Sequence, residues 1–269
     1  CCVPPLAEVG MRGAAAFDAA TCLAAIARHE AQSVILLPQM LAALTAALEC
    51  GLPAPRTLRF AAVGGARVSP ELLVRARRAG LPAYEGYGLS ECASVVALNH
   101  PGADCPGSVG RPLRHADVRI VEGEIQVRAA GEAPWVRTGD LGCLDGNGFL
   151  HIHGRRKNIL ITSFGRNVSP EWPESELLAG RSIAQAAVFG EGRAQLIAVV
   201  VPVHADIPDI ALEREIQAAN ARLPDYARVA RWLRADDAFT VRNGHGTANG
   251  RPRHAAIWQT YGERLDALL

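Results

Sequence analysis

The sequence predicts an α/β protein whose chain changes character twice. Helix-like and strand-like segments alternate from Asp18 onward, short strands separated by glycine turns follow from Gly107 to Ile152, and strands mix with helices after Gly154. Alternation of the first kind is typical of a mainly parallel sheet covered by helices. We therefore expect an α/β sheet subdomain over 1–106, a small β subdomain over 107–156 and an α+β domain over 157–269.

The first part contains three predicted helices and two predicted strands. In chain order we expect a helix from Asp18 to His29, a strand over 33–37, a helix over 39–49, a strand over 57–63 and a helix that begins at Ser69. Asp18 and Ser69 are residue types that cap helices, and Pro70 suits a first helical position. Ligands of such sheets bind beyond the carboxyl ends of strands, so the loops after Val63 and Glu85 are the places to search.

The remaining two parts contain shorter elements. We expect strands at 118–121, 124–127, 186–189 and 196–201, and helices that begin at Pro170 and that cover 207–221. The first two strands alternate with glycine turns, which indicates a β region. The mixture after Gly154 suits a separate domain of about 110 residues.

Composition excludes several classes of protein. The 269 residues include 28 basic and 27 acidic side chains, without the basic excess that binding to a nucleic-acid backbone needs. No apolar run approaches the roughly 18 residues of a membrane span, and the first residues lack the order of a signal peptide. The seven cysteines show no Cys-x-x-Cys spacing, so we expect reduced thiols and a cytoplasmic protein.

Four short motifs carry candidate chemistry. They are Tyr84–Glu91, Arg137–Asp140, Gly154–Lys157 with its continuation to Gly165, and Thr247–Arg251. The first combines an aromatic ring, flexible glycines, a hydroxyl and a carboxylate, which could stack a purine, approach phosphates and hold Mg²⁺. Taken alone, it is more typical of a glycine-rich strand-to-helix turn capped by Ser90.

The other three motifs also have two readings each. Asp140 could bind the hydroxyls of a ribose or simply belong to a hairpin turn. Arg155 follows a glycine and could bind ribose or phosphate, although basic clusters are usually solvated. The loop that ends at Arg251 could be a flexible surface segment.

The order and spacing of the four motifs together resemble the adenylate-forming superfamily of acyl-CoA synthetases, luciferases and peptide-synthetase adenylation domains. The resemblance extends from about Ala14 to Ile257, and its most specific stretch is 154–170. Further matches are 64–66, 123–125 and 223–226. The resemblance implies part of a large N-terminal domain, with an incomplete parallel-sheet subdomain and a small β-barrel-like subdomain, followed by a smaller, mobile α+β C-terminal domain.

The resemblance also implies a role for each matching residue. Gly64, Gly65 and Ala66 would line the adenine face, Glu85 and Gly86 would border its edge, and Tyr87 would stack on the ring. Ser90 would lie near the α-phosphate, Glu91 would hold Mg²⁺, and Asp140 and Arg155 would bind the ribose hydroxyls. Lys157 would be the hinge of the C-terminal domain, Gly165 would flank the pantetheine tunnel of coenzyme A, and Arg251 stands where the family has a catalytic lysine.

The implied reaction has two steps. A carboxylic acid, fatty or aromatic, attacks the α-phosphorus of ATP in the presence of Mg²⁺, and an acyl-adenylate forms with release of pyrophosphate. The thiol of coenzyme A or of a carrier protein then displaces AMP and forms a thioester. The predicted function is therefore that of an AMP-forming acyl-CoA synthetase in fatty acid metabolism.

Two departures from the family leave two alternatives to this function open. The family's Ser/Thr/Gly-rich phosphate loop is absent, and Lys157 is the single lysine among 27 arginines, so no other lysine can replace the one at Arg251. We expect the C-terminal portion of a longer enzyme, which pairs with a second copy or with a missing N-terminal segment across an exposed apolar sheet edge. The alternatives are a noncatalytic nucleotide-binding or interaction module and a coincidence of motifs in an ordinary α/β domain.

Overall fold

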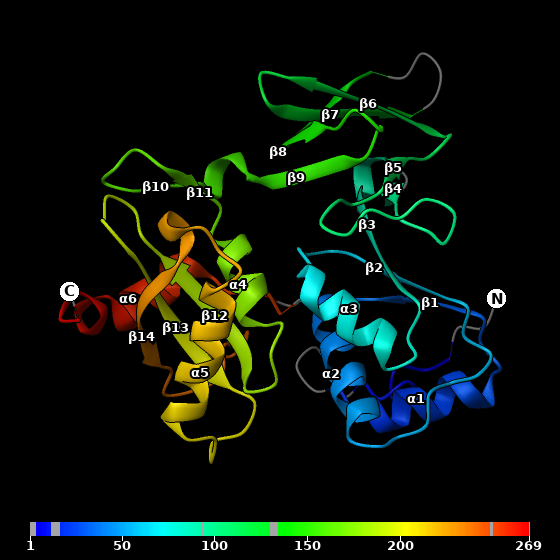
Figure 1. The fold of residues 1–269 in the computed structure, drawn as a ribbon, viewed down its shortest axis with the longest axis horizontal. Coiled ribbons are helices and arrows are strands. Elements are labelled where there is room, and N and C mark those ends of the chain that lie inside the picture. Colours follow the sequence, from blue (N-terminus) through cyan, green and yellow to red (C-terminus); the bar gives the residue numbers. More distant parts are fainter. Residues whose placement is uncertain (1–3, 12–16, 93, 130–133, 248–249, 269) are drawn as a thin grey trace. The chain divides into compact units, whose positions relative to one another are not determined.

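The computed structural model describes residues 4–11, 17–92, 94–129, 134–247 and 250–268. The chain divides into two compact units, of which Phe17–Asn158 and Ile159–Leu269 are the main parts (Figure 1). Each unit has its own sheets and its own buried apolar cores.

A five-stranded sheet organises the first part of the first unit. Its strands, in spatial order, are β1 (Ser33–Leu36), β2 (Phe60–Val63), β3 (Ala83–Leu89), β4 (Ser94–Leu98) and β5 (Arg111–Pro112). The first three run parallel, with Leu36 beside Val63 and Val63 beside Glu85, while β4 and β5 are antiparallel. The predicted parallel sheet is therefore confirmed. β1 forms its edge, and the side chain of Ile35 on that strand is 83% exposed.

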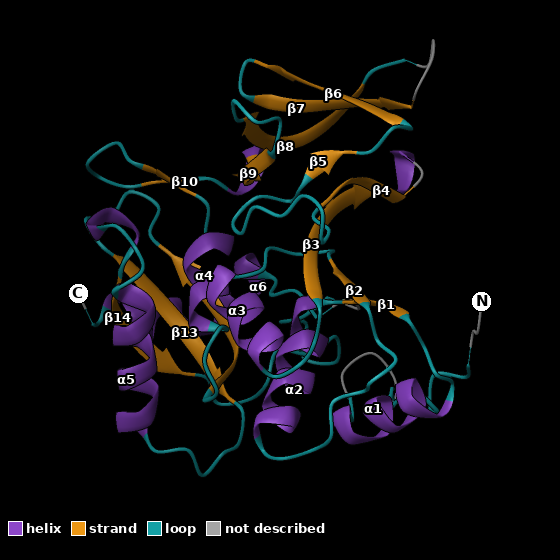
Figure 2. Cartoon of the chain, turned by 45° about the vertical axis from the view of Figure 1, so that its right-hand side comes forward, coloured by secondary structure: helices purple, strands orange, loops and turns teal. Residues whose placement is uncertain are grey.

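The same part of the chain contains three helices, as the sequence predicts. They are α1 (Ala19–Arg28), α2 (Pro38–Glu49) and α3 (Pro70–Arg78). Asp18 accepts a hydrogen bond from the backbone N–H of Ala20, and Ser69 from that of Glu71, so both predicted caps are present. The helix α2 packs against both others, which Figures 1 and 2 show.

The strand β3 continues through the position after Glu85 at which the sequence suggests a loop. It continues to Leu89 and exchanges its parallel partner β2 for the antiparallel partner β4. Glycines permit this close approach, because a Cβ atom on Gly88 would lie 1.5 Å from the carbonyl oxygen of Ser94. Ser90 then begins a three-residue 3₁₀ turn, η1 (Ser90–Cys92), so the strand leads into a short 3₁₀ turn and not into an α-helix.

The small β region is an open antiparallel sheet. Its strands follow one another as β6 (Ala116–Val121), β7 (Glu124–Ala129), β8 (Val136–Leu144) and β9 (Leu150–Arg155). In the described residues β6 and β9 are the two ends of this sheet, so the expected barrel-like form is replaced by a curved meander over the buried side chains of Ile125, Val127 and Leu150. The boundary at residue 107 stays a prediction, and β5 extends the first sheet beyond it.

The second unit is built on the strands β12 (Ile183–Phe189), β13 (Leu196–Pro202) and β14 (Val229–Arg234). Helices α4 (Glu171–Leu177) and α5 (Asp209–Asn220) share one apolar core with this sheet, and α6 (His254–Asp266) shares another. Successive residues of β13 alternate between the two cores: Ala198 and Val200 face the first, and Val199 and Val201 the second. A strand covered on both faces explains the continuous apolar run in the sequence.

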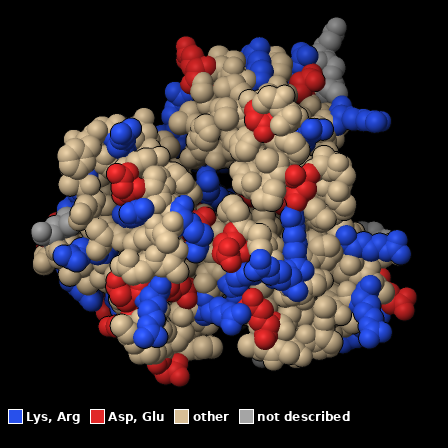
Figure 3. All heavy atoms as spheres, in the orientation of Figure 1, with Lys and Arg blue, Asp and Glu red and all other residues tan. Residues whose placement is uncertain are grey.

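A small hairpin and two turns complete the described elements. The hairpin is β10 (Leu160–Ile161) with β11 (Asn167–Val168), and the turns are η2 (Arg156–Asn158) and η3 (Asp225–Ala227). Of the helices in the described ranges, none has the length and hydropathy that a membrane crossing requires. Acidic and basic side chains are interspersed on the face drawn in Figure 3.

Candidate functional site

A buried carboxylate, Asp140, is the centre of the candidate site. It lies on β8 directly opposite Arg155 of β9, and its Oδ1 atom is 2.9 Å from Arg155 Nε. The hydroxyl of Tyr87, from β3, donates a hydrogen bond of 2.6 Å to Asp140 Oδ2. Three residues that the sequence singled out are thus in direct contact, although 53 positions separate Tyr87 from Asp140.

The turn before Asp140 is held by the side chains of Thr138 and Glu124, for which the sequence motifs imply no role. The Thr138 hydroxyl donates to the carbonyl oxygen of Ile125 and accepts from the N–H of Asp140. Gly139, with φ of +71°, donates its N–H to Glu124 Oε1. The sequence match at 123–125 includes Glu124. Its hydrogen bond to Gly139 becomes apparent only from the pairing of β7 with β8.

Glu124 is itself buried and paired. Arg137 donates two hydrogen bonds to Glu124 Oε2, and this guanidinium holds the pKa of the carboxyl below its usual range. A carboxylate in this state accepts hydrogen bonds without a proton of its own. It therefore fixes the backbone from which Asp140 projects.

The electrostatics of the site keep Asp140 available as an acceptor. Its side chain is 6% exposed, and Arg155, whose side chain is 44% exposed, compensates its charge. Burial and the hydrogen bond to Asp140 raise the pKa of the Tyr87 hydroxyl, so Tyr87 remains a donor. A carboxylate has about four acceptor positions, of which the two contacts above use two.

The glycine loop after β2 lies against β3. A Cβ atom on Gly64 would be 3.1 Å from the carbonyl oxygen of Gly86, and Gly65 has a φ of +85°, which favours glycine. Ala66 is exposed on the same loop. Glu85 fastens this loop, because its Oε1 accepts the N–H of Val68, and burial raises the pKa of Glu85 to about 7.

The other expected site residues are not brought into contact with Asp140 by the interactions described above. Ser90 and Glu91 are exposed on η1, and Lys157 is exposed on η2. Gly165 and Arg251 belong to the second unit. Gly165 has a φ of +71° in the turn between β10 and β11.

The two ends of the fourth motif, Thr247 and Arg251, are hydrogen-bonded to each other. The N–H of Thr247 donates to the carbonyl oxygen of Arg251, and the N–H of Arg251 donates to the Thr247 hydroxyl. The side chain of Arg251 is exposed. The two residues of this motif at 248 and 249 lie outside the described residues.

Comparison with protein families identifies the class of protein that this fold and site define. The profile of the AMP-binding enzyme family matches residues 7–139, and that of the AMP-binding enzyme C-terminal domain matches residues 157–268. The chain therefore belongs to the AMP-binding enzyme family, as the resemblance predicted.

Two curated relatives show where in the family the sequence is similar. A long-chain-fatty-acid–CoA ligase of Mycobacterium tuberculosis is 36% identical over 186 residues, which are 63% of this chain and 31% of that protein. A 2-succinylbenzoate–CoA ligase of Bacillus subtilis is 32% identical over 202 residues, which are 65% of this chain and 41% of that protein. The chain thus spans less than half the length of the curated relatives it matches.

Solved structures agree with the fold. O-succinylbenzoate coenzyme A synthetase of Bacillus subtilis, in complex with AMP, matches with a TM-score of 0.69 and 26% identity over 89% of this chain and 53% of that one. An anthranilate CoA ligase in complex with anthranoyl-AMP matches with a TM-score of 0.75 over 93% of this chain and 53% of that one. Because that identity is 21%, this second likeness concerns the fold alone.

Proposed function

We propose that this chain supplies the adenosine-binding part of an AMP-forming acyl-CoA ligase. The reaction would join a carboxylic acid to ATP as an acyl-adenylate and then transfer the acyl group to the thiol of coenzyme A. The observation that carries the proposal is the contact of Asp140 with both Tyr87 and Arg155 inside the first unit.

The geometry around Asp140 suits a vicinal diol. Its two free acceptor positions can take the 2′- and 3′-hydroxyls of a ribose, and Arg155 can donate to a ribose oxygen. Hydrogen bonds to a charged acceptor contribute about 1.5–3 kcal/mol, more than those between neutral groups. The acid and the guanidinium are held by neighbouring strands, so ribose binding requires little ordering of side chains.

The neighbouring loops would accommodate the adenine and the phosphates. Gly64, Gly65 and Ala66 present little side-chain bulk, which lets a flat base approach the backbone, and the half-buried Tyr87 ring offers a stacking surface. Ser90 and Glu91 provide a hydroxyl and an exposed carboxylate on η1, and hard oxygen donors of this kind fit Mg²⁺. When bound there, Mg²⁺ would neutralise charge on the phosphates of ATP.

The second unit would contribute to both half-reactions. Arg251 carries a permanent positive charge on an exposed loop and would attract the carboxylate and the α-phosphate. Lys157 lies next to Asn158, where the first unit ends, and would act as the hinge, and Gly165 would admit the pantetheine arm. The relatives are named for a fatty acid and for an aromatic acid, which supports a fatty or aromatic carboxylic acid as substrate.

Calorimetric titration of the chain with AMP tests the proposal. We expect Asp140→Ala to weaken AMP binding by about 1–3 kcal/mol, because the charged acceptor of the ribose hydroxyls is lost. The matched control is Asp117→Ala, since Asp117 forms a cross-strand pair with Arg128 on the same sheet, with 2.8 Å between Oδ2 and Nε. Equal AMP affinity in both variants, with both folded by circular dichroism, would refute the assignment.

One observation favours a second candidate, a nucleotide-binding module without catalysis. The chain has a single lysine, Lys157, and an arginine at position 251, where a planar guanidinium replaces a compact ammonium group. Carboxylate-dependent exchange of pyrophosphate with ATP separates the two candidates. Exchange by the purified chain would show that it forms an acyl-adenylate and would exclude the module, whereas AMP binding without exchange favours the module.

A further inference from the structure

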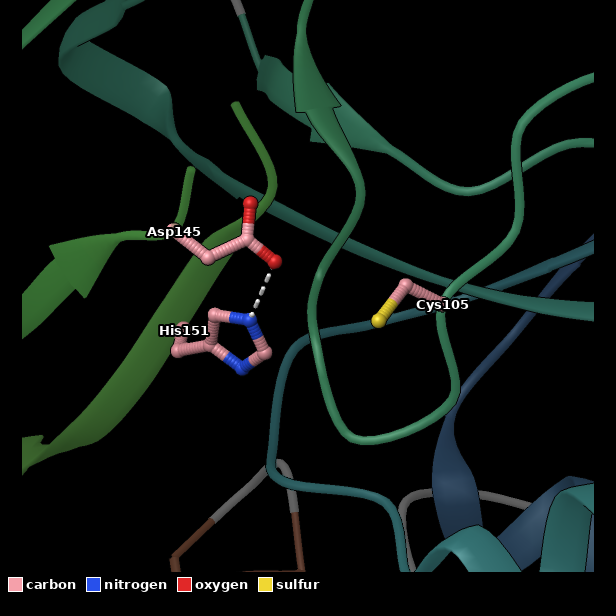
Figure 4. A group of neighbouring side chains, drawn as sticks. All are labelled: Cys105, Asp145 and His151. Carbon is pink, nitrogen blue, oxygen red and sulfur yellow. Dashed lines mark hydrogen bonds and ion pairs between the residues drawn. The ribbon is translucent and has the colours of Figure 1, made fainter. Parts of the chain in front are cut away.

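Three potential metal ligands meet on the first unit, away from the contacts of Asp140. They are Cys105 in the connection between β4 and β5, Asp145 in the turn after β8, and His151 on β9 (Figure 4). One ligand atom from each residue lies within 4.8 Å of the other two. Within the part of the chain that the structure describes, this is the one group of three or more His, Cys, Asp or Glu side chains that meets this condition.

The backbone around Cys105 is held in place. Its N–H donates to Oδ1 of the buried Asn99, and its carbonyl oxygen accepts from the hydroxyl of Ser108. The same loop is tied to β9, because Val109 donates to the carbonyl oxygen of Leu150 over 2.9 Å. The thiol therefore projects from an ordered segment toward the imidazole of His151, as Figure 4 shows.

Asp145 divides its two oxygens between two tasks. Oδ1 accepts the N–H groups of Asn147 and Phe149 at 2.8 and 2.9 Å and so shapes the turn. Oδ2 faces His151 Nε2 at 3.3 Å.

The set of donors selects a particular class of cation. A thiolate and an imidazole favour a borderline-soft ion such as Zn²⁺ over Mg²⁺ or Ca²⁺, which prefer oxygen donors. Donor atoms of a tetrahedral zinc site lie about 3.3–3.8 Å apart, so side-chain movements of about 1 Å would close this group around an ion. All three side chains are partly exposed, which gives the ion a path from solvent and leaves a coordination position for water.

We propose that Cys105, Asp145 and His151 form a binding site for a borderline-soft divalent cation, Zn²⁺ in the first place. Coordination converts the Cys105 thiol to a thiolate, and its proton passes to solvent. The bound ion joins the connection between β4 and β5 to the turn between β8 and β9. It thereby links the five-stranded sheet to the four-stranded sheet within the first unit.

Zinc titration of the full chain, against a chromophoric chelator and without nucleotide, tests this site. We expect one zinc ion per chain, and at least tenfold weaker binding in Cys105→Ser and in His151→Gln. Cobalt should give a sulfur-to-metal charge-transfer band in the wild type and not in Cys105→Ser. Asp145→Asn keeps an oxygen for the turn and removes the charge, so it should also weaken zinc binding.

Cys143 provides the matched control. Its exposed thiol is 3.6 Å from His153 Nε2. This thiol–imidazole pair is not part of the three-residue group above. Cys143→Ser should bind zinc like the wild type, and loss of binding in this variant would overturn the proposal. Equal zinc affinity in Cys105→Ser and the wild type would also overturn it.

Thiol alkylation offers a second, residue-specific measurement. Zinc should slow the reaction of Cys105 with iodoacetamide, read by peptide mass spectrometry, and leave the exposed Cys50 unchanged. Equal rates at Cys105 with and without zinc would contradict the site. Neither measurement involves AMP, so either can fail while the proposed nucleotide function stands.

Discussion

Glu85 shows at the scale of one residue how the candidate site couples to proton binding. The carboxyl is buried on β3, and it accepts the N–H of Val68. Burial raises its pKa from 4.5 to about 7, against the opposing influences of that hydrogen bond and of Arg67. In the native protein Glu85 therefore retains a proton at pH values where the unfolded chain has already lost it.

The pH dependence of stability follows from this difference. Between pH 4.5 and 7 the folded state binds more protons, so the free energy of unfolding should fall as the pH rises, by up to about 3 kcal/mol. Glu85→Gln keeps an acceptor for Val68 and removes the titration. Urea unfolding at several pH values should show a flatter profile for Glu85→Gln and the wild-type profile for the exposed Glu263→Gln. A slope unchanged by Glu85→Gln would contradict the raised pKa.

Tyr87 permits a separate test of its ring and its hydroxyl. Tyr87→Phe removes the donor to Asp140 but keeps a stacking surface, so AMP affinity should fall by about 1 kcal/mol. Tyr87→Ala also removes the ring, and the loss should grow by about 1–3 kcal/mol if the ring stacks on adenine. Calorimetry with AMP measures both values, and equal losses in the two variants would show that the ring makes no contribution.

Residue types and order were sufficient to single out Tyr87, Asp140 and Arg155, which the structure brings into contact. The residues that hold them could not be found in this way. Thr138 and Glu124 act through the pairing of β7 with β8, and that register is a property of the folded sheet. Likewise, the burial of Glu85 depends on the path of the loop over Val68, which no local pattern records.

At the scale of elements, the sequence predicted some helices and strands and missed others. The caps Asp18 and Ser69 and the apolar run of β13 predicted their elements, because each signal is local. The helix α6 was not predicted, although its buried residues Ile257, Tyr261 and Leu265 recur every four positions. The continuation of β3 beyond Glu85 depends instead on β4, so it required the tertiary structure.

Glu215 of α5 shows how one side chain can join two elements of the second unit. Its carboxylate accepts the N–H groups of Arg181, Ser182 and Ile183 at the start of β12. Gly180 leaves room for it, because a Cβ atom there would lie 2.0 Å from Glu215 Cδ. The carboxylate thus accepts hydrogen bonds from three consecutive backbone donors where β12 begins.

We expect Glu215→Ala to lower the free energy of unfolding of the second unit by about 2–4 kcal/mol, since three N–H groups lose a charged acceptor. Arg214→Ala, one position away on the exposed face of α5, should change it by less than about 0.5 kcal/mol. Denaturant unfolding followed by tryptophan fluorescence measures both. Similar stabilities of the two variants would show that the carboxylate is dispensable.

At the scale of the whole molecule, the division into two units coincides with the single lysine of the chain. Lys157 is exposed on η2, next to the end of the first unit at Asn158. Each unit has cores formed from its own strands and helices, which is the condition for folding alone. A protease specific for lysine has one target in this sequence, and that target lies at the boundary.

Native digestion with a lysine-specific protease should therefore yield two fragments, 1–157 and 158–269, and Lys157→Arg should prevent the cleavage. Because Tyr87, Asp140 and Arg155 all lie in the first fragment, we expect it to bind AMP with an affinity within about tenfold of that of the full chain. Mass spectrometry identifies the fragments, and calorimetry measures AMP binding after their separation. A first fragment that is folded by circular dichroism but does not bind AMP would show that nucleotide binding requires residues of the second unit.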